Sequence, residues 1–154
     1  MPKGIYIVPF VENEPVKSYA PGSDERKQLK KALKEAKSKE VDIPMFIGGK
    51  EVRSGDKKAM HPPHETGHLL GHYHAGTADH VRQAIDAAMA AKEDWENMPW
   101  EHRASIFLKA AELLAGPYRY KMNAATMLAQ SKNAYQAEID SACELIDFLR
   151  FNVQ

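Results

Sequence analysis

The sequence contains a single cysteine, Cys143, so it can form neither an intrachain disulfide nor a zinc cluster built from cysteines. This scarcity is typical of a protein in a reducing compartment. The first residues lack the uninterrupted apolar stretch of a secretory signal, and no apolar run approaches the length that crosses a membrane. We therefore expect a cytoplasmic protein with no membrane partner.

The sequence also has no excess of positive or negative side chains, because Lys and Arg together number 21 and Asp and Glu together number 21. This balance gives no indication of the basic surface that is typical of nucleic-acid binding, so no nucleic-acid partner is expected. Hydrophobic side chains make up 44% of the 154 residues, which is enough for a core and argues against disorder.

The first half of the sequence predicts short strands and one helix. The apolar run Gly4–Phe10 is typical of a strand. Ser23 is a favourable N-cap for a helix that runs to about Ser38. The segment from Met45 to Arg53 predicts a β-hairpin, because two short runs flank a Gly-Gly turn.

The second half predicts four helices. Thr77 caps the first, Pro99 or Trp100 opens the second, the third covers roughly residues 118–130, and the fourth starts near Ala134. The fourth reaches the last residues without a glycine, proline or basic stop signal, which predicts that the chain is part of a longer polypeptide. Its expected buried residues are Ala142, Leu145, Ile146, Leu149 and Val153.

A histidine-rich stretch, HPPHETGHLLGHYHAG, contains the zinc-peptidase pattern H-E-x-x-H in His64, Glu65 and His68. His74 extends it to the longer metzincin pattern. On a helix, this spacing would bring two imidazoles to one zinc ion, with the glutamate beside the metal-bound water as general base.

The surrounding residues argue against a zinc peptidase. Pro62 and Pro63 come directly before the motif, so no helix can continue into it from upstream. Gly67 would weaken a helix interior by about 1 kcal/mol relative to alanine. We therefore predict no native metal site, but a strand, a turn at Thr66-Gly67 and an exposed strand; adventitious binding of nickel or zinc stays open.

Four stretches together resemble the N-terminal region of the aldehyde dehydrogenase superfamily. They are FIGGKEV, HPPHETGHLLG, TADHVRQAIDAAMAAKEDW and EHRASIFLKAAELLAG. Thr66-Gly67 matches the T-G of that family's N-P-x-T-G turn, although the asparagine is absent and one residue is inserted. The resemblance implies an α/β fold for the whole enzyme, of which this segment would be a mainly α-helical part with short N-terminal β-strands.

Residues 10–33 and 136–152 resemble the Δ1-pyrroline-5-carboxylate dehydrogenase branch, also called L-glutamate γ-semialdehyde dehydrogenase. The resemblance implies that residues 1–44 are a family-specific extension with one helix. Residues 45–76 would be a β-hairpin and strand segment. Residues 77–154 would supply helices of the cofactor-domain side, truncated at the C-terminus.

The resemblance implies that the full-length protein oxidises L-glutamate γ-semialdehyde to L-glutamate with NAD in proline catabolism. A cysteine thiolate would attack the aldehyde, and hydride would then pass to the nicotinamide. The resemblance also implies a homo-oligomer, whose other partners are the small-molecule substrate and the remainder of its own polypeptide.

Almost none of the family's functional motifs lie in this chain. The oxyanion asparagine (in P-F-N-F), the glycine-rich cofactor turn, the base glutamate (in L-E-L-G-G) and the nucleophile (in G-Q-x-C) are absent. Cys143 lies in SACEL and is expected to be a buried packing residue. We therefore expect no catalytic residue, NAD bound by residues beyond this segment, and no activity from the fragment alone.

Glu144 is the one exception. In this branch the glutamate of the A-x-E-L-I-D-F segment lies at the mouth of the aldehyde site, so the resemblance implies a substrate-binding role for Glu144. Asp140 and Asp147 share its helix face, however, and an acidic stripe is commonly just solvated. Glu138 is expected to make a structural contact without chemistry.

Three alternatives stay open at this point. In the first, the chain is part of another aldehyde dehydrogenase with a different substrate. In the second, it is a non-catalytic helical binding module. The least favoured alternative is a zinc metallopeptidase that uses His64, Glu65, His68 and His74. Kinetics with several aldehydes would separate the first, and a stop codon after Gln154 would favour the second.

Overall fold

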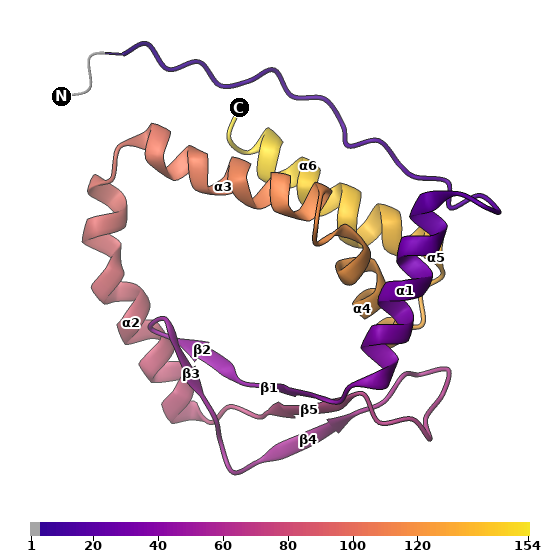
Figure 1. Ribbon diagram of the computed structural model, residues 1–154. Helices are drawn as coiled ribbons and strands as arrows, with labels where there is room; N and C mark the ends of the chain where they lie inside the picture. The colour runs from indigo at the N-terminus through magenta and orange to yellow at the C-terminus, as the bar shows by residue number, and fades with distance from the viewer. Residues whose placement is uncertain (1–3) are drawn as a thin grey trace.

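The computed structural model describes residues 4–154, which form helices and short strands (Figure 1). This composition confirms the prediction of a mainly α-helical segment with short strands. The elements are α1 (Asp24–Ser38), β1 (Val41–Ile43), β2 (Met45–Ile47), β3 (Lys50–Val52), β4 (Lys57–Met60), β5 (Gly71–His74), α2 (Ala78–Asn97), α3 (Trp100–Ala115), α4 (Arg119–Gln130), α5 (Ala134–Ala137), the π-helical turn η1 (Glu138–Cys143) and α6 (Glu144–Phe151). Helices α3 and α6 lie on the opposite side of the molecule from strands β1, β4 and β5 (Figure 1).

Strand β5 lies in the middle of a three-stranded sheet with the order β1-β5-β4. It runs parallel to β1 and antiparallel to β4. Gly71 pairs with Val41 at a φ of +142°, and a Cβ there would lie 2.0 Å from the Val41 carbonyl oxygen. Only glycine permits this approach. The predicted exposed strand is therefore a central one, and its last residue, His74, is buried.

Strands β2 and β3 form the predicted hairpin, with Ile47 opposite Lys50. Gly48 and Gly49 at the turn have φ values of +57° and +75°. A two-residue hairpin turn of this hand needs positive φ at both positions, which glycine adopts without steric cost. The predicted turn is confirmed.

Two helices begin at the side chains predicted to cap them. The Ser23 hydroxyl accepts a hydrogen bond from the backbone N–H of Arg26 at the start of α1. The Thr77 hydroxyl likewise accepts from the backbone N–H of His80 at the start of α2. Each cap satisfies a backbone donor that no helical carbonyl reaches.

Helix α1 packs against α4, and α3 packs against α6. The best-buried cluster lies between α1 and α4 and is built on Tyr19, Leu29 and Ala124. Helix α2 carries apolar residues at helical spacing, but Val81 and Ile85 among them are more than half exposed and no α2 residue is buried. Near the end of this helix, Trp95 packs edge-to-face against Phe107 of α3.

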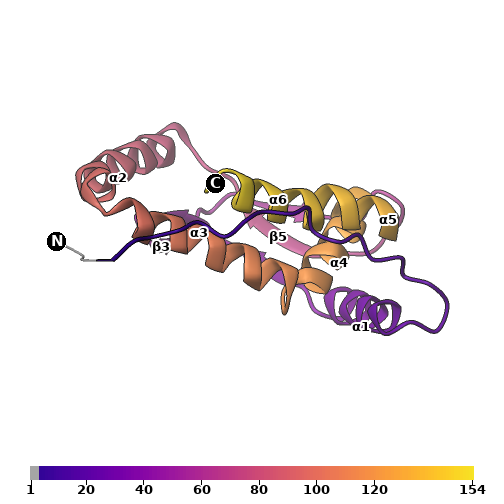
Figure 2. The ribbon, with the colours of Figure 1, turned by 90° about the horizontal axis from the view of Figure 1, so that it is seen from above.

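Residues 4–22 form an extended segment, called the strap below, that runs over α3 and α6 (Figure 2). The strand predicted at Gly4–Phe10 is wrong, because this run forms no strand. A strand needs a neighbour that supplies backbone hydrogen bonds, and no described strand pairs with the strap.

The fourth predicted helix is interrupted by the π turn between α5 and α6. Ala142 and Ile146 are buried as predicted, and Leu149 and Val153 are half-buried. Leu145 is 39% exposed, so its predicted burial is wrong. The π turn adds one residue to the helical path and thereby changes which side chains point inward. Among the described residues, no helix has the length and hydropathy to cross a membrane.

Candidate functional site

A buried network of charged and polar side chains joins α4, the π turn and the strap. Arg119 at the start of α4 and Glu138 at the start of the π turn have no exposed surface. Asn123, one turn after Arg119, is equally inaccessible. Such groups are rarely buried unless they are paired, so their hydrogen bonds decide whether this arrangement is stable.

The Glu138 carboxylate accepts hydrogen bonds on both oxygens. Its Oε1 accepts from the Arg119 Nε at 3.1 Å and from the backbone N–H of Lys17 at 2.9 Å. Its Oε2 accepts from the Asn123 Nδ2 at 2.7 Å and from the Tyr19 hydroxyl. The carboxylate is therefore fully satisfied, and it links two helical elements to the strap.

These hydrogen bonds set the charge of the network. Burial by itself would raise the pKa of the Glu138 carboxyl, but hydrogen bonds led by the one from Arg119 hold that pKa below its usual range. Burial and the hydrogen bond to Glu138 raise the pKa of the Tyr19 phenol. Near neutral pH the network consequently holds an ionised Glu138 and a neutral Tyr19.

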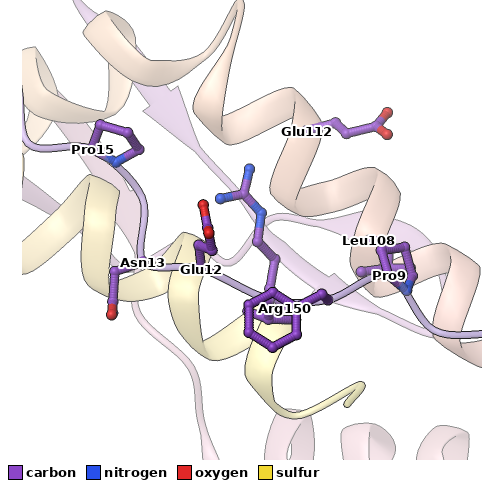
Figure 3. Close-up of a pocket in the computed structure, with 9 residues that line it drawn as sticks. Pro9, Glu12, Asn13, Pro15, Leu108, Glu112 and Arg150 are labelled. Atoms are coloured by element: carbon purple, nitrogen blue, oxygen red, sulfur yellow. The ribbon is translucent and has the colours of Figure 1, made fainter.

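The strap is held by two arginines. Arg119 Nη2 donates to the Pro15 carbonyl oxygen at 2.8 Å, and its Nη1 pairs with Glu14. Arg150 of α6 pairs with the other oxygen of Glu14 at 2.7 Å. Figure 3 shows Arg150 beside the strap at a pocket of about 410 Å³, which the strap forms with α3.

The π turn directly precedes Glu144. The backbone N–H of Glu144 donates to the Ile139 carbonyl, five residues earlier, instead of to the residue four back as in an α-helix. The Ser141 hydroxyl oxygen lies 2.6 Å from the Ala137 carbonyl oxygen and 3.2 Å from the Asn123 Oδ1. The buried network therefore contacts the π turn at Glu138 and again at Ser141.

Glu144 differs from the two acidic residues expected beside it. Asp140 pairs with Lys132 at 2.7 Å, and Asp147 accepts hydrogen bonds from the strap at Asn13. Glu144 is exposed and, within residues 4–154, makes no side-chain hydrogen bond or ion pair. Of the three carboxylates, it is the one left free to meet a ligand.

Cys143 is buried beside the network, as expected for a packing residue. Its Sγ lies 3.3 Å from the Arg119 Nη2. Burial and the nearby charge of Glu138 raise the pKa of the Cys143 thiol to about 11. Because the thiolate is the reactive form, this cysteine is a poor nucleophile near neutral pH.

The H-E-x-x-H motif lies in turns between β4 and β5, and not on a helix. The turn predicted at Thr66-Gly67 is confirmed. His64 Nδ1 lies 2.8 Å from the Ser131 hydroxyl, while Glu65 pairs with Lys37. That hydrogen bond from Lys37 holds the pKa of the Glu65 carboxyl below its usual range.

The other two histidines of the motif also have separate surroundings. His74 lies inside the sheet, with Nδ1 2.7 Å from the Ser54 carbonyl oxygen and Nε2 3.2 Å from Asp42. The Nε2 of His68 is buried without a hydrogen-bond partner. Over residues 4–154, no three His, Cys, Asp or Glu side chains gather closely enough to hold a metal ion.

The network was only partly visible in the sequence. Glu138 was expected to make a structural contact, and it makes several. Arg119, Tyr19 and Asn123 were not predicted from the sequence. Their separations from Glu138 range from 15 residues for Asn123 to 119 residues for Tyr19, and no local pattern indicates such pairing. An arginine placed between two apolar helical stretches, directly after Gly116-Pro117 and Tyr118, was the one available hint.

The described residues do not fit a dinucleotide cofactor. Such a cofactor binds at a glycine-rich turn between a strand and a helix, where backbone N–H groups meet the phosphates. The connection from β5 to α2 contains one glycine, Gly76, and no such turn. A groove of about 950 Å³ between α1, α4 and strands β1 and β4 also lacks one, and includes neither Glu138 nor Glu144.

Residues 50–154 match the aldehyde dehydrogenase family. The Delta-1-pyrroline-5-carboxylate dehydrogenase of Agaricus bisporus is 50% identical over 149 residues, which cover 96% of this chain and 27% of that protein. The mitochondrial enzyme of the same name from Homo sapiens is 44% identical over 144 residues, which cover 94% of this chain and 26% of that protein.

A solved structure has the same fold. The Delta-pyrroline-5-carboxylate dehydrogenase from Mycobacterium tuberculosis bound with NAD superposes with a TM-score of 0.95 at 47% identity, over 98% of this chain and 28% of that chain. The chain thus spans about a quarter of the length of the curated relatives it matches. By its sequence and its fold alike, this chain belongs to the aldehyde dehydrogenase family.

Proposed function

We propose that this chain is the N-terminal part of an NAD-dependent dehydrogenase that oxidises L-glutamate γ-semialdehyde to L-glutamate. The observation that carries the proposal is the 50% identity to a Delta-1-pyrroline-5-carboxylate dehydrogenase across 96% of this chain. The 149 matched residues include most of the strap, which lies outside the general family match over residues 50–154.

Within that enzyme the segment supplies structure and one wall of the substrate site, and the remaining polypeptide supplies the chemistry. Support comes from the chain itself, since its one cysteine is a buried thiol and no turn within residues 4–154 fits a dinucleotide. NAD, when bound by the remainder, accepts the hydride from the substrate. The segment alone is therefore proposed to be inactive.

Glu144 is proposed to bind the ammonium group at the amino-acid end of the substrate. Its carboxylate is exposed at the start of α6, while Asp140 and Asp147 are engaged by the protein. A free carboxylate attracts a cationic ammonium group and orients it through charge-assisted hydrogen bonds. That contact would favour an amino-acid aldehyde over a simple aliphatic one.

Three further parts of the proposal concern organisation. Residues 1–44 are a branch-specific extension, residues 45–76 a strand segment and residues 77–154 the helices of the cofactor-domain side. The family match begins at residue 50, close to the boundary between residues 44 and 45, and so supports that boundary. The enzyme is a cytoplasmic homo-oligomer. Cell fractionation tests the location, since the relative from Dictyostelium discoideum is named mitochondrial.

The first test is to sequence the coding DNA beyond Gln154. In-frame P-F-N-F and G-Q-x-C segments would support the enzyme, whereas a stop codon after Gln154 would leave a chain without a nucleophile and sink the proposal. Kinetics of the complete protein follow, with glutamate semialdehyde beside aliphatic aldehydes. Equal kcat/KM for all of them would mean another aldehyde dehydrogenase with a different substrate.

A further inference from the structure

The π turn decides which side of α6 faces the core. In an α-helix each residue turns the path by about 100°, so a side chain seven residues after Glu138 would share its face. That residue is Leu145, which is 39% exposed, while Ile146 is fully buried together with Glu138. The inward face has moved by one residue, as expected from the extra residue that a π turn inserts.

The same shift moves Glu144. Without the π turn, the Glu144 side chain would leave the helix about 100° away around the axis. The α-helical alternative is plausible for this sequence, because it would bury Leu145, an apolar residue, in place of Ile146. The α-helical register and the register with the π turn would thus bury side chains of similar hydrophobicity. Polar contacts at the turn determine which of the two registers forms.

Those contacts come from Ser141 and Asn123. The Ser141 hydroxyl faces the Ala137 carbonyl oxygen at 2.6 Å, and a serine bonded to a carbonyl four residues back disturbs regular α-helical geometry. The Asn123 Nδ2 donates to Glu138 and to Tyr19, which turns its Oδ1 toward the Ser141 hydroxyl at 3.2 Å. Because Asn123 is fully buried, its orientation is held firmly.

We propose that Ser141, oriented by Asn123, is a positioning residue that maintains the π turn and so presents Glu144 to the substrate. The proposal rests on the substrate-binding role proposed for Glu144. Ser141 need not touch the substrate. It acts on substrate affinity through the register of α6, and leaves the chemical step to residues elsewhere in the polypeptide.

The test uses the complete protein with Ser141→Ala, Glu144→Ala and the double variant. Ser141→Ala should raise KM for glutamate semialdehyde by about threefold, and by no more than the roughly tenfold expected for Glu144→Ala, with kcat little changed. In the Glu144→Ala background the same substitution should change KM by less than about twofold, since the group that it positions is already gone. Independent effects that multiply would overturn the proposal.

Ser105→Ala is the matched control. Ser105 lies in the middle of α3, and its hydroxyl also bonds a preceding backbone carbonyl, that of His102, at 2.7 Å. This substitution removes the same group without touching the π turn, so KM should not change. A rise equal to that of Ser141→Ala would show a general effect on helices and would contradict the proposal.

A crystal structure of the Ser141→Ala variant separates this proposal from the one on Glu144. We expect the backbone N–H of residue 144 to bond Asp140 instead of Ile139, with Leu145 turned inward. A retained π turn would overturn the positioning role, whatever the kinetics. A changed register together with unaltered KM in Glu144→Ala would keep Ser141 as the determinant of register and refute substrate binding by Glu144.

Discussion

Arg119 and Glu138 face each other in the protein interior, with the Arg119 Nε 3.1 Å from the Glu138 Oε1 and no exposed surface on either side chain. Both charges have lost their hydration, so each depends on the other and on the polar groups around them. Replacing such a pair by apolar residues can be neutral, but removing one partner leaves an uncompensated charge. This relationship makes the network sensitive to single substitutions.

Glu138→Gln should therefore destabilise the protein strongly. The amide has nearly the size of the carboxylate but cannot balance Arg119, and breaking a buried pair in this way costs about 3–5 kcal/mol. Urea unfolding of the complete protein measures the change. Asp79→Asn, which removes an ion pair with Arg82 in which both side chains are mostly exposed, should cost less than about 1 kcal/mol. Equal losses in the two variants would contradict a special role for the buried pair.

Glu138 should also make stability depend on pH in the acidic range. Its pKa is lowered in the folded protein, so its contribution is complete above the ordinary glutamate pKa of about 4.3. The contribution declines as the pH falls below that value and is lost as the pH falls through the lowered folded pKa. Unfolding free energies measured from pH 7 to pH 3 should show the parent and Glu138→Gln converging toward low pH. A constant difference would mean that Glu138 does not titrate in this way.

Glu144→Ala in the complete enzyme should raise KM for glutamate semialdehyde. The expected rise is about tenfold, since a hydrogen bond to a charged group contributes about 1.5 kcal/mol. Steady-state kinetics should be measured with an aliphatic aldehyde as well. Because that substrate has no ammonium group, its KM should not change. Glu35→Ala removes another exposed helical glutamate and serves as the control. Unchanged kinetics with the semialdehyde would refute substrate binding by Glu144.

The histidine-rich stretch should not retain stoichiometric zinc. His64, Glu65 and His74 each have a separate protein partner, and the motif is not helical. After dialysis against a chelator, metal analysis should give far less than one zinc per chain, even if nickel or zinc bound during purification. One tightly held zinc per chain, together with peptidase activity, would restore the metallopeptidase reading.

Gly71→Ala should disrupt the pairing of β1 with β5. A Cβ at this position would lie 2.0 Å from the Val41 carbonyl oxygen at a φ of +142°, so the strands must separate. We expect a loss of about 3 kcal/mol or more in the free energy of unfolding. Gly67→Ala is the matched control, because a Cβ there meets nothing within 4 Å. A thermal unfolding midpoint equally lowered in both variants would be the contrary result.

Local features of the fold were predictable because their causes lie within a few residues. Ser23 and Thr77 cap helices through their own hydroxyls, and Gly48-Gly49 forms a turn that few other pairs can adopt. The family resemblance was equally accessible, since it depends on motifs in sequence order. The sequence alone thus determined the helices, the hairpin and the family.

Only the tertiary structure decided the partners of Glu138, the register of α6 and the place of β5. Tyr19 donates a hydrogen bond to Glu138 across a separation of 119 residues in the sequence, and no local pattern predicts that contact. Leu145 and Ile146 are both apolar, so hydrophobicity alone does not select which of them is buried. The contact between Ser141 and Asn123 at the π turn makes that selection. Long-range hydrogen bonds in a desolvated interior made these choices, because there each unpaired polar group is costly.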